Sequence, residues 1–225
     1  MNKCEQCIVR EFSALKALNK DELIRIADCK TSYVVKKGET IFDEGDSLNG
    51  IYCIKDGVCK LSKLSDNGKD QIVKLVKKGE LLGQRSLISE ESTNLSAIAI
   101  EDMQVCFIPK QEILQFFNEN NQFSLNMMKS VCGDLKDADD NMVNLAQKTV
   151  KQRLAEILLK LETDFGINDD GSLKIQLSRE EIAGMIGTAT ESRIRLLSEF
   201  NKEGWITLQG KKITITNKIE LQRMV

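Results

Sequence analysis

The sequence predicts an α+β fold with two domains, residues 1–147 and residues 148–225. Short runs of valine, isoleucine, leucine and tyrosine between Tyr33 and Pro109 alternate with glycines, which is typical of short antiparallel strands in a barrel or sandwich. A long helical segment follows at about 111–147. The C-terminal region then carries two helices with start and stop signals and two alternating strands. A chain of 225 residues is long enough for two modest cores.

The other elements follow from apolar spacing and turn residues. Residues 12–28 and residues 150–161 have apolar side chains at helical intervals, so we expect a helix in each. Pro109 is the only proline, and it can occupy the first turn of the long helical segment. A loop at 166–171 precedes an expected strand at 173–177. Turns of the β-region are expected at Gly38, Gly45, Gly50, Gly57, Gly68, Gly79 and Gly83.

The long helical segment contains a narrow apolar stripe. Its members alternate at spacings of three and four, the a/d pattern of paired helices, over about three heptads. They are Met128, Val131, Leu135, Ala138, Met142, Leu145 and Thr149. Four aspartates, at 134, 137, 139 and 140, crowd the other faces. The alternative is an amphipathic helix that lies on its own core, but a narrow stripe on a long helix favours a partner helix and a symmetric dimer.

Residues 178–187 predict a helix with clear ends. Ser178 and Glu181 have the spacing of a capping box, and Gly187 can adopt the positive φ that ends a helix. Ala183 is small enough for a second helix to cross closely. The apolar face consists of Ile182, Ala183 and Ile186.

A second helix follows at once. Thr188 and Glu191 repeat the capping-box spacing, although Thr190 is a rival cap. Arg193 falls where an apolar side chain is usual, so it either lies along the helix surface or contacts a base or phosphate. The expected buried residues are Ile194, Leu197 and Phe200, with Leu196 at the edge.

The two helices and the following strands form the pattern of a winged helix-turn-helix. In this motif the first residues of the second helix meet base edges in the major groove, where arginine can bind guanine and a carboxylate can accept from cytosine. The alternative is a small helical hairpin with solvated charges, but two caps, a small residue, a turn glycine and a basic wing in order favour double-stranded DNA. The predicted contacts are Ser178, Arg179, Thr188, Thr190, Glu191, Ser192, Arg195, Lys211 and Lys212.

The charge is small and uneven. Residues 1–147 carry 19 basic and 23 acidic residues (19 − 23 = −4), and residues 148–225 carry 13 and 11 (13 − 11 = +2). Specific contacts must therefore contribute more to DNA binding than the overall electrostatic attraction does. The chain has neither a long apolar run nor a basic-then-apolar leader, so we expect a cytoplasmic protein without a membrane span.

The residue types exclude several kinds of site. The chain has no histidine, which excludes serine–histidine catalysis, histidine-ligated haem and mixed cysteine–histidine zinc sites. It also lacks a phosphate-binding loop and a nucleophile motif, so we do not expect an enzyme. Seven scattered cysteines indicate a reducing cytoplasm rather than a disulfide framework.

This order of regions resembles the Crp–Fnr superfamily of bacterial transcription regulators. Four motifs carry the resemblance: residues 37–46 (KGETIFDEGD), 51–57 (IYCIKDG), 79–83 (GELLG) and 177–183 (LSREEIA). The resemblance covers essentially the whole chain. It implies a cyclic-nucleotide-binding-type antiparallel β-roll, a dimerisation helix and a winged helix-turn-helix, with RNA polymerase as a further partner. Thr190 stands where many members have a base-reading arginine, so the operator stays open.

The resemblance places an effector pocket at Gly83, Gln84, Arg85, Ser86 and Ser96. Members that bind cyclic AMP use a Gly-Glu pair for the ribose and an arginine about ten residues on for the phosphate. Here Gln84 replaces the acid, and Asn94 or Leu95 replaces the arginine. Arg85 is displaced by one residue and is expected on the other face of a strand. A phosphate without a fixed cation is poorly compensated, so the pattern argues against cyclic AMP.

The oxygen-sensing branch of the family binds an iron–sulfur cluster with three N-terminal cysteines and one in the β-roll. Cys4 and Cys7 match the first pair, and Cys106 matches the β-roll cysteine. Ser13 occupies the third position, where an oxygen is a rarer and weaker ligand, and Cys29 could replace it only with a changed loop. The alternative is a mobile Cys4/Cys7 terminus and a Cys106 that packs as a small hydrophobe. The cysteines expected to pack are Cys53, Cys59 and Cys132.

Three functions compete at this stage. The leading hypothesis is a homodimeric, sequence-specific DNA-binding transcription regulator whose β-roll senses a redox signal or oxygen. The second is a regulator that responds to a small ligand and has structural cysteines. The third is a ligand-binding or chaperone-like interaction protein that no longer reads DNA. The sequence leaves open the effector, the target genes and the choice between activation and repression.

Overall fold

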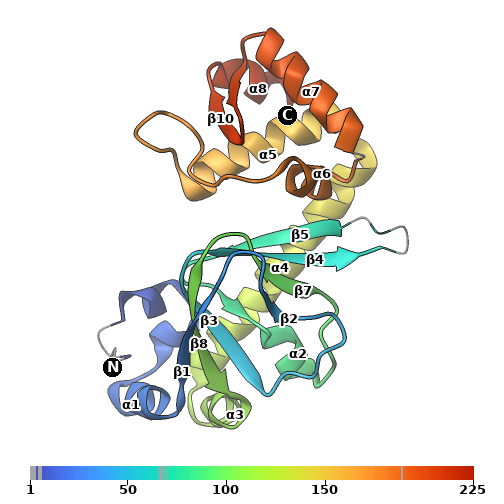
Figure 1. Cartoon of the computed structure of the whole chain (residues 1–225). Helices are drawn as coiled ribbons and strands as arrows, with labels where there is room; N and C mark the ends of the chain where they lie inside the picture. Colours follow the sequence, from blue (N-terminus) through green and yellow to red (C-terminus); the bar gives the residue numbers. More distant parts are fainter. Residues whose placement is uncertain (1–3, 5–6, 66–67, 69, 189) are drawn as a thin grey trace. The chain divides into compact units, whose positions relative to one another are not determined.

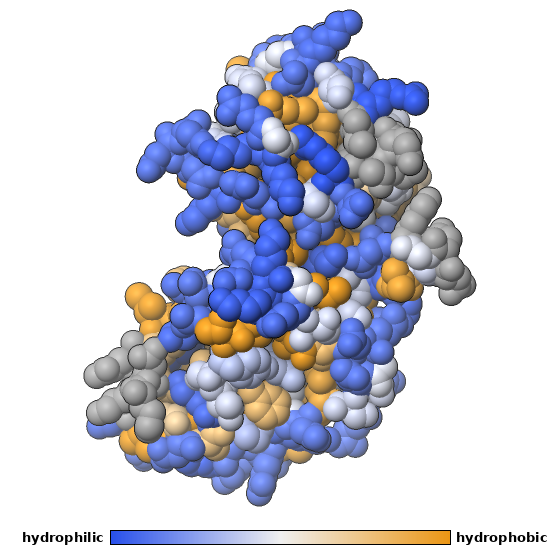
Figure 2. Space-filling model, in the orientation of Figure 1, coloured by the Kyte–Doolittle hydropathy of each residue, from blue (hydrophilic) through white to orange (hydrophobic). Residues whose placement is uncertain are grey.

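The computed structural model describes residues 4, 7–65, 68, 70–188 and 190–225. The chain divides into two compact units. The first comprises Met1–Lys63 and Val73–Asp137, and the second comprises Leu64–Ile72 and Ala138–Val225. Figure 1 traces the elements of each unit. Polar residues cover much of the face drawn in Figure 2, with apolar side chains showing between them.

The described part of the N-terminal segment from Cys7 to Cys29 contains three short helices where we predicted one at 12–28. They are the 3₁₀-helices η2 (Ile8–Phe12) and η3 (Ala14–Ala17) and the α-helix α1 (Lys20–Cys29). The single helix is wrong because Ser13 is extended, with φ −128° and ψ 179°, and interrupts the turn. Asn19 then starts α1 with a capping box. Its Oδ1 accepts from the Glu22 amide at 3.0 Å, and Glu22 Oε2 accepts from the Asn19 amide at 2.7 Å.

The β-region forms two antiparallel sheets, as the glycine spacing predicted (Figure 1). One sheet has the order β1-β8-β3-β6 and the other the order β2-β7-β4-β5. The strands are β1 (Thr31–Val35), β2 (Thr40–Phe42), β3 (Gly50–Asp56), β4 (Val58–Leu64), β5 (Asp70–Lys77), β6 (Leu81–Leu82), β7 (Ser96–Ala99) and β8 (Met103–Pro109). Gly50 permits the close approach of β3 and β8, since a Cβ there would lie 2.2 Å from the Ile108 carbonyl oxygen.

The strands β3 and β8 of the first sheet carry buried residues on both faces. Alternate residues of a strand point to opposite faces. Ile51 and Cys53 of β3 therefore join a core with the N-terminal segment, whereas Ile54 joins a core with the second sheet. On β8, Cys106 belongs to the first core and Val105 to the second. The N-terminal segment is thus an integral part of the β-roll core.

The long helical segment predicted at about 111–147 is two helices, α3 (Lys110–Glu119) and α4 (Asn121–Gln147). Pro109 ends β8 and precedes α3 rather than entering its first turn. The break lies at Asn120, whose Oδ1 accepts from the Phe123 amide at 3.0 Å. Its Nδ2 donates to the Ala17 carbonyl at 3.0 Å and to both carboxylate oxygens of Glu22, at 3.2 and 3.0 Å. One amide therefore starts α4 and ties it to the N-terminal segment.

The second unit contains the C-terminal helices and a hairpin. The elements are α5 (Val150–Phe165), α6 (Arg179–Ile186), α7 (Thr190–Lys202), β9 (Ile206–Gln209), β10 (Lys212–Ile215) and α8 (Lys218–Met224). Thr149, which we assigned to the apolar stripe, is the N-cap of α5 and forms a capping box with Gln152. Our strand at 173–177 is also wrong. The described residues of that segment make single bridges only, Ile167 to Leu173 and Ser172 to Thr214.

The alternation that suggested this strand has another origin. The alternating apolar residues are all buried: Leu173, Ile175 and Leu177. The alternation therefore reflects their burial, not pairing with a neighbouring strand. In the part of the chain that the structure describes, none of the helices has the length and apolar character needed to cross a membrane.

Asn120 provides a test of this architecture. We expect Asn120→Ala to lower the free energy of unfolding by about 1–3 kcal/mol, because it removes the cap of α4 and a partner of the buried Glu22 carboxylate. Urea denaturation measures the change. The matched control is Asn121→Ala on the exposed first turn, which should stay within about 0.5 kcal/mol of the wild type. Equal stability of the two variants would contradict this role.

Candidate nucleic-acid interface and thiol cluster

The first helix of the predicted DNA-binding motif has the expected ends. Ser178 Oγ accepts from the Glu181 amide at 3.1 Å, and Glu181 Oε2 accepts from the Ser178 amide at 2.6 Å. Gly187 ends α6 with φ +61°, and its amide donates to the Ala183 carbonyl. The Ser178 hydroxyl is therefore occupied by capping, which leaves its contact with DNA a prediction.

The second helix, α7, begins at Thr190, so Thr190 is its first residue rather than its cap. Thr188 is half-buried in the turn, and its amide lies 3.3 Å from the Ala183 carbonyl oxygen. Arg195 is exposed. Of the expected buried residues, Leu197 and Phe200 are buried and Leu196 is half-buried. The side chains of Thr190, Glu191, Ser192, Arg193 and Ile194 lie outside what the structure describes, so their predicted roles stay predictions.

The wing is the hairpin of β9 and β10, whose register pairs Lys212 with Gln209. Lys211 is exposed at its turn. Lys212 Nζ forms an ion pair with Asp170 Oδ2 at 2.5 Å, so part of its charge is compensated within the protein. Arg179 Nη2 donates to the Gly210 carbonyl at 3.0 Å and joins the start of α6 to the wing. Of the two wing lysines, Lys211 is thus the one that we expect to contact a phosphate.

Arg153 on α5 was missed in the sequence. Its Nε donates to the Ile186 carbonyl at 2.8 Å, and its Nη1 donates to the carbonyls of Lys148 at 2.8 Å and Leu145 at 3.0 Å. These carbonyls lie at the ends of α6 and α4, where helices leave carbonyls without helical partners. The guanidinium therefore holds α4, α5 and α6 together. The only hint in the sequence was a basic residue just after a capping box.

The effector segment is not a strand. Gly83 has φ +86° and leads into the short helix α2 (Gln84–Ser89), so our placement of Arg85 on a strand face is wrong. Arg85 is exposed, forms an ion pair with Glu91 at 2.7 Å and donates to Asn94 Oδ1 at 3.2 Å. Ser86 is buried, whereas Ser96 is half-buried and its hydroxyl accepts from the Glu44 amide.

Gln84 connects this segment to α4. It is buried, and its Nε2 donates to Asp134 Oδ2 at 3.3 Å. Asp134 also pairs with Lys74, whose Nζ lies 2.8 Å from both Asp134 and Glu80. Arg85 and Lys74 are therefore both engaged with carboxylates, and a phosphate bound by either cation would have to displace an ion pair.

Four of the thiols of the first unit, those of Cys4, Cys7, Cys53 and Cys106, lie on one side of its first sheet. The antiparallel register places Cys53 of β3 opposite Cys106 of β8. Ser32 of β1 lies on the other side, with its Oγ 3.2 Å from Cys106 Sγ. Cys4 is buried in the same core, and Cys7 packs against it. The structure thus brings together Cys4, Cys7 and Cys106, and it adds Cys53, which we expected only to pack.

The side chain of Lys30 interacts with these thiols. Burial raises the pKa of Cys4, and a hydrogen bond with the Lys30 side chain opposes that rise. Burial lowers the pKa of Lys30, but the hydrogen bond with Cys4 and the charges of Cys4, Cys106 and Cys7 raise it overall. Burial raises the pKa of Cys53 to about 12, and the three other thiols add to the effect. Lys30 is therefore placed to compensate thiolate charge.

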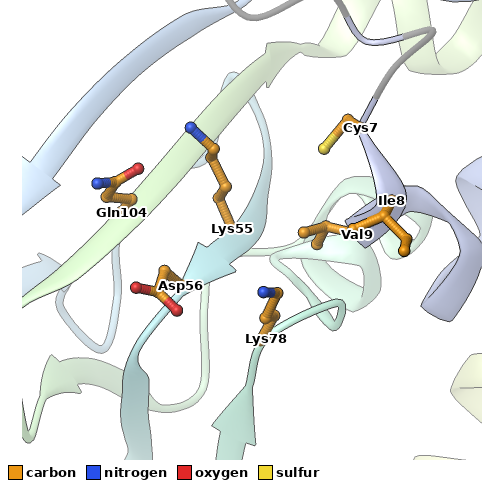
Figure 3. Close-up of a pocket in the computed structure, with 7 residues that line it drawn as sticks. All are labelled: Cys7, Ile8, Val9, Lys55, Asp56, Lys78 and Gln104. Atoms are coloured by element: carbon orange, nitrogen blue, oxygen red, sulfur yellow. The ribbon is translucent and has the colours of Figure 1, made fainter.

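A shallow pocket of about 330 Å³ opens beside Cys7. Figure 3 shows its lining, which is Cys7, Ile8, Val9, Lys55, Asp56, Lys78 and Gln104. Of the four thiols, Cys7 is half-buried, whereas Cys4, Cys53 and Cys106 are buried. Cys7 is therefore the one of these thiols that lines a pocket open to a small reagent.

The donors suit a multi-iron cluster better than a single ion. Among residues 4, 7–65, 68, 70–188 and 190–225, no three Cys, Asp or Glu side chains converge closely enough to bind one metal ion. An iron–sulfur cluster allows its cysteine ligands to lie farther apart, because each thiolate binds a different iron. Ser13 is poorly suited as a ligand, since its Oγ donates to the Arg10 carbonyl and accepts from the Leu15 amide.

The remaining cysteines differ. Cys59 is buried, as expected for a packing residue. Cys132 is exposed, so the expectation that it packs within the chain is wrong; it lies on α4 next to Val131 of the predicted stripe. Cys29 is half-buried, and its Sγ donates to the Ile26 carbonyl.

Comparison with known proteins identifies both units. Residues 33–120 match the cyclic nucleotide-binding domain family, and residues 152–224 match the Crp-like helix-turn-helix domain family. The chain belongs to the Crp–Fnr superfamily of bacterial transcription regulators. This confirms the resemblance to this superfamily, the α+β fold and the prediction of a DNA-binding transcription regulator.

Several Crp–Fnr proteins are similar over nearly the whole chain. The transcriptional activator protein Anr of Pseudomonas protegens is 28% identical over 221 residues, which are 97% of this chain and 90% of the relative. The fumarate and nitrate reduction regulatory protein of Escherichia coli K12 is 27% identical over 224 residues, 98% of this chain and 89% of the relative. The structure of FixK2 from Bradyrhizobium japonicum matches with a TM-score of 0.77 and 26% identity, covering 87% of this chain and 96% of FixK2. These relatives are regulators rather than enzymes.

Substitutions at Arg195 and Lys211 test the predicted DNA contacts of α7 and the wing. We expect Arg195→Ala to cost about 1–3 kcal/mol of binding and to relax base choice at one operator position. Lys211→Ala should weaken binding evenly across sequences and lower the salt slope by about 1. Binding across a randomised operator pool at several salt concentrations measures the base choice and the salt slope of both variants, with Lys202→Ala at the exposed end of α7 as control. Identical effects of the two substitutions on every sequence would contradict the assignment.

Proposed function

We propose that this regulator is a homodimer whose binding to DNA is controlled by a redox or oxygen signal at the thiol cluster, defined as Cys4, Cys7 and Cys106. The observation that carries this proposal is the gathering of these thiols beside Lys30 in the core of the first unit. Thiolates are soft ligands for iron and are also the groups that oxidants attack. A bound iron–sulfur cluster would supply sensitivity to oxygen.

The same core reaches the start of α4. Cys4 and Cys106 share it with Phe116 of α3 and with Phe123 and Met127 of α4. The rings of Phe116 and Phe123 pack edge to face, with centroids 5.8 Å apart. A change in charge or volume at the thiols would therefore be felt by the first turns of α4. Such a shift between two packings is a physical route for a switch.

The apolar stripe of α4 supports the homodimer. Met128, Leu135, Met142 and Leu145 are 53%, 62%, 65% and 42% exposed in the single chain, and Ala138 is exposed while Val131 is half-buried. Large apolar side chains repeated along one exposed face usually mark an interaction surface. The a/d spacing suits a second copy of the same helix. The two helix-turn-helix domains of such a dimer would then bind DNA half-sites about one helical turn apart. A relative named a transcriptional activator supports RNA polymerase as a further partner.

A small-ligand signal is the second candidate. Gln84 Oε1 is buried without a hydrogen-bond partner among the described atoms, and the same side chain contacts Asp134 of α4. A ligand that donates to this oxygen would also act on α4. Cyclic AMP fits poorly, because Arg85 and Lys74 are already paired with carboxylates.

The dimer is tested at Leu135. We expect Leu135→Asp to give a monomer with much weaker operator binding, because an unpaired carboxylate between two helices costs several kcal/mol. Sedimentation velocity measures the oligomeric state. Ser130→Asp places the same charge on an exposed part of α4 outside the stripe and should leave the dimer intact. A dimeric Leu135→Asp protein would exclude the stripe as the interface.

The redox signal is tested by comparing Cys4→Ser with Cys106→Ser. Both should abolish the same oxidant-dependent change in operator affinity, measured by fluorescence anisotropy on protein purified without oxygen. Cys132→Ser, on the exposed face of α4, should retain the change. Colourless, metal-free wild-type protein whose affinity is unaffected by oxidant and by both substitutions would make the cysteines structural and favour the small-ligand signal.

A further inference from the structure

We propose that Cys53 completes the thiol cluster as its fourth thiolate ligand, in the role that the family's sequence pattern gives to the position of Ser13. The inference rests on the proposed function, because it names a residue of the same site. It is carried by the strand register of the first sheet and by the core that the four thiols share.

The register places the Cys53 and Cys106 side chains next to each other. β3 and β8 pair Cys53 with Cys106, between the pairs Tyr52–Phe107 and Ile54–Val105. Side chains directly opposite in an antiparallel pair have Cβ atoms about 4.5–5.5 Å apart and point to the same face. That face is the one that packs on the N-terminal segment, since Cys4, Cys53 and Cys106 belong to one core. Two ligands on rigid neighbouring strands thus face two ligands on the N-terminal segment.

The electrostatic neighbours of Cys53 agree with this placement. Burial raises its pKa, and the thiols of Cys106, Cys7 and Cys4 each add to the rise. Cys59 is also buried and has a pKa raised to about 12, but the charged neighbours that act on it are Glu80 and Lys74. Cys53 thus shares its core with the other three thiols and is paired with one of them, Cys106, whereas Cys59 belongs to the second core.

The two rival donors are less suitable. Ser13 Oγ already takes part in two hydrogen bonds that hold η2 and η3 together. Cys29 has its Sγ directed to the Ile26 carbonyl, and among its neighbours only Cys4 is a member of the cluster. Glu112 is a further negative neighbour of Cys29, which disfavours a thiolate there.

Charge compensation is available at the site. A thiol that binds iron loses its proton, and four thiolates together carry more negative charge than the iron–sulfur core carries positive charge, so a nearby cation is favourable. Lys30 is hydrogen-bonded to Cys4, and its charge also favours the thiolate form of Cys53. The buried thiols thus share one ammonium group.

The test uses a preformed four-iron, four-sulfide cluster that carries four fluorinated aryl thiolates. Each protein thiol that binds an iron breaks one bond to an aryl thiolate and transfers its proton to that leaving group, so no oxidant or reductant is needed. Fluorine NMR counts the aryl thiolates that remain on the protein-bound cluster. We expect none on the wild-type protein and none on Ser13→Ala, Cys29→Ala or the matched buried control Cys59→Ala.

The Cys53→Ala variant should retain one aryl thiolate per cluster, and Cys53→Ala combined with Ser13→Cys should retain none. Thermal unfolding of the cluster-free variants verifies that they are folded. One retained thiolate on the wild-type protein, or on Ser13→Ala or Cys29→Ala instead of Cys53→Ala, would overturn the inference and leave the proposed function standing. A wild-type protein that takes up no cluster would overturn both the inference and the cluster-based form of the proposed function.

Discussion

The side chain of Asn120 is the contact on which the first unit depends. Its carbonyl oxygen caps α4, and its amide nitrogen binds the buried carboxylate of Glu22 and the carbonyl of Ala17. A buried carboxylate requires hydrogen bonds, and Glu22 obtains them from Asn19 and Asn120. The N-terminal segment that carries Cys4 and Cys7 is thereby fixed to the first turn of α4.

Arg153 has the corresponding role at the other end of α4, within the second unit. Its guanidinium satisfies carbonyls of the last helical turn and of the Lys148 linker, and it also binds the carbonyl that ends α6. A cation at a helix C-terminus is favoured by the helix dipole as well. Each end of α4 is thus joined by one polar side chain to the elements that carry function in its own unit: the thiols at one end and the reading helices at the other. Because Asn120 and Arg153 each have several hydrogen-bond partners, a shift of α4 would break these hydrogen bonds unless the partners move with the helix.

The sequence predicted the features that depend on local chemistry. Capping boxes, glycine turns and apolar alternation are short-range signals, and they located α6, the β-region and the wing. The errors occurred where a longer-range contact decides. Asn120 breaks a helix without glycine or proline because Glu22 lies next to it. Residues 173–177 alternate as a strand does, yet they lack a continuous partner. Gly83 turns the chain into α2, which moved Arg85 off the expected strand.

Cys53 illustrates why part of the site could not be found from the sequence. Its neighbours in the chain indicate a buried strand position, and only the register with β8 reveals that it faces Cys106. Neutral thiols are small and apolar enough to pack like alanine or valine, so the same residues complete the core when no metal is bound. Burial raises the pKa of both Cys4 and Cys53, which favours the neutral thiols in that state. Metal binding or oxidation would change their charge or bonding at the point where the core reaches α4. The effector segment differs, because its cations Lys74 and Arg85 already have carboxylate partners. Of the two places that connect to α4, the thiol cluster is therefore the one whose charge a redox signal changes most directly.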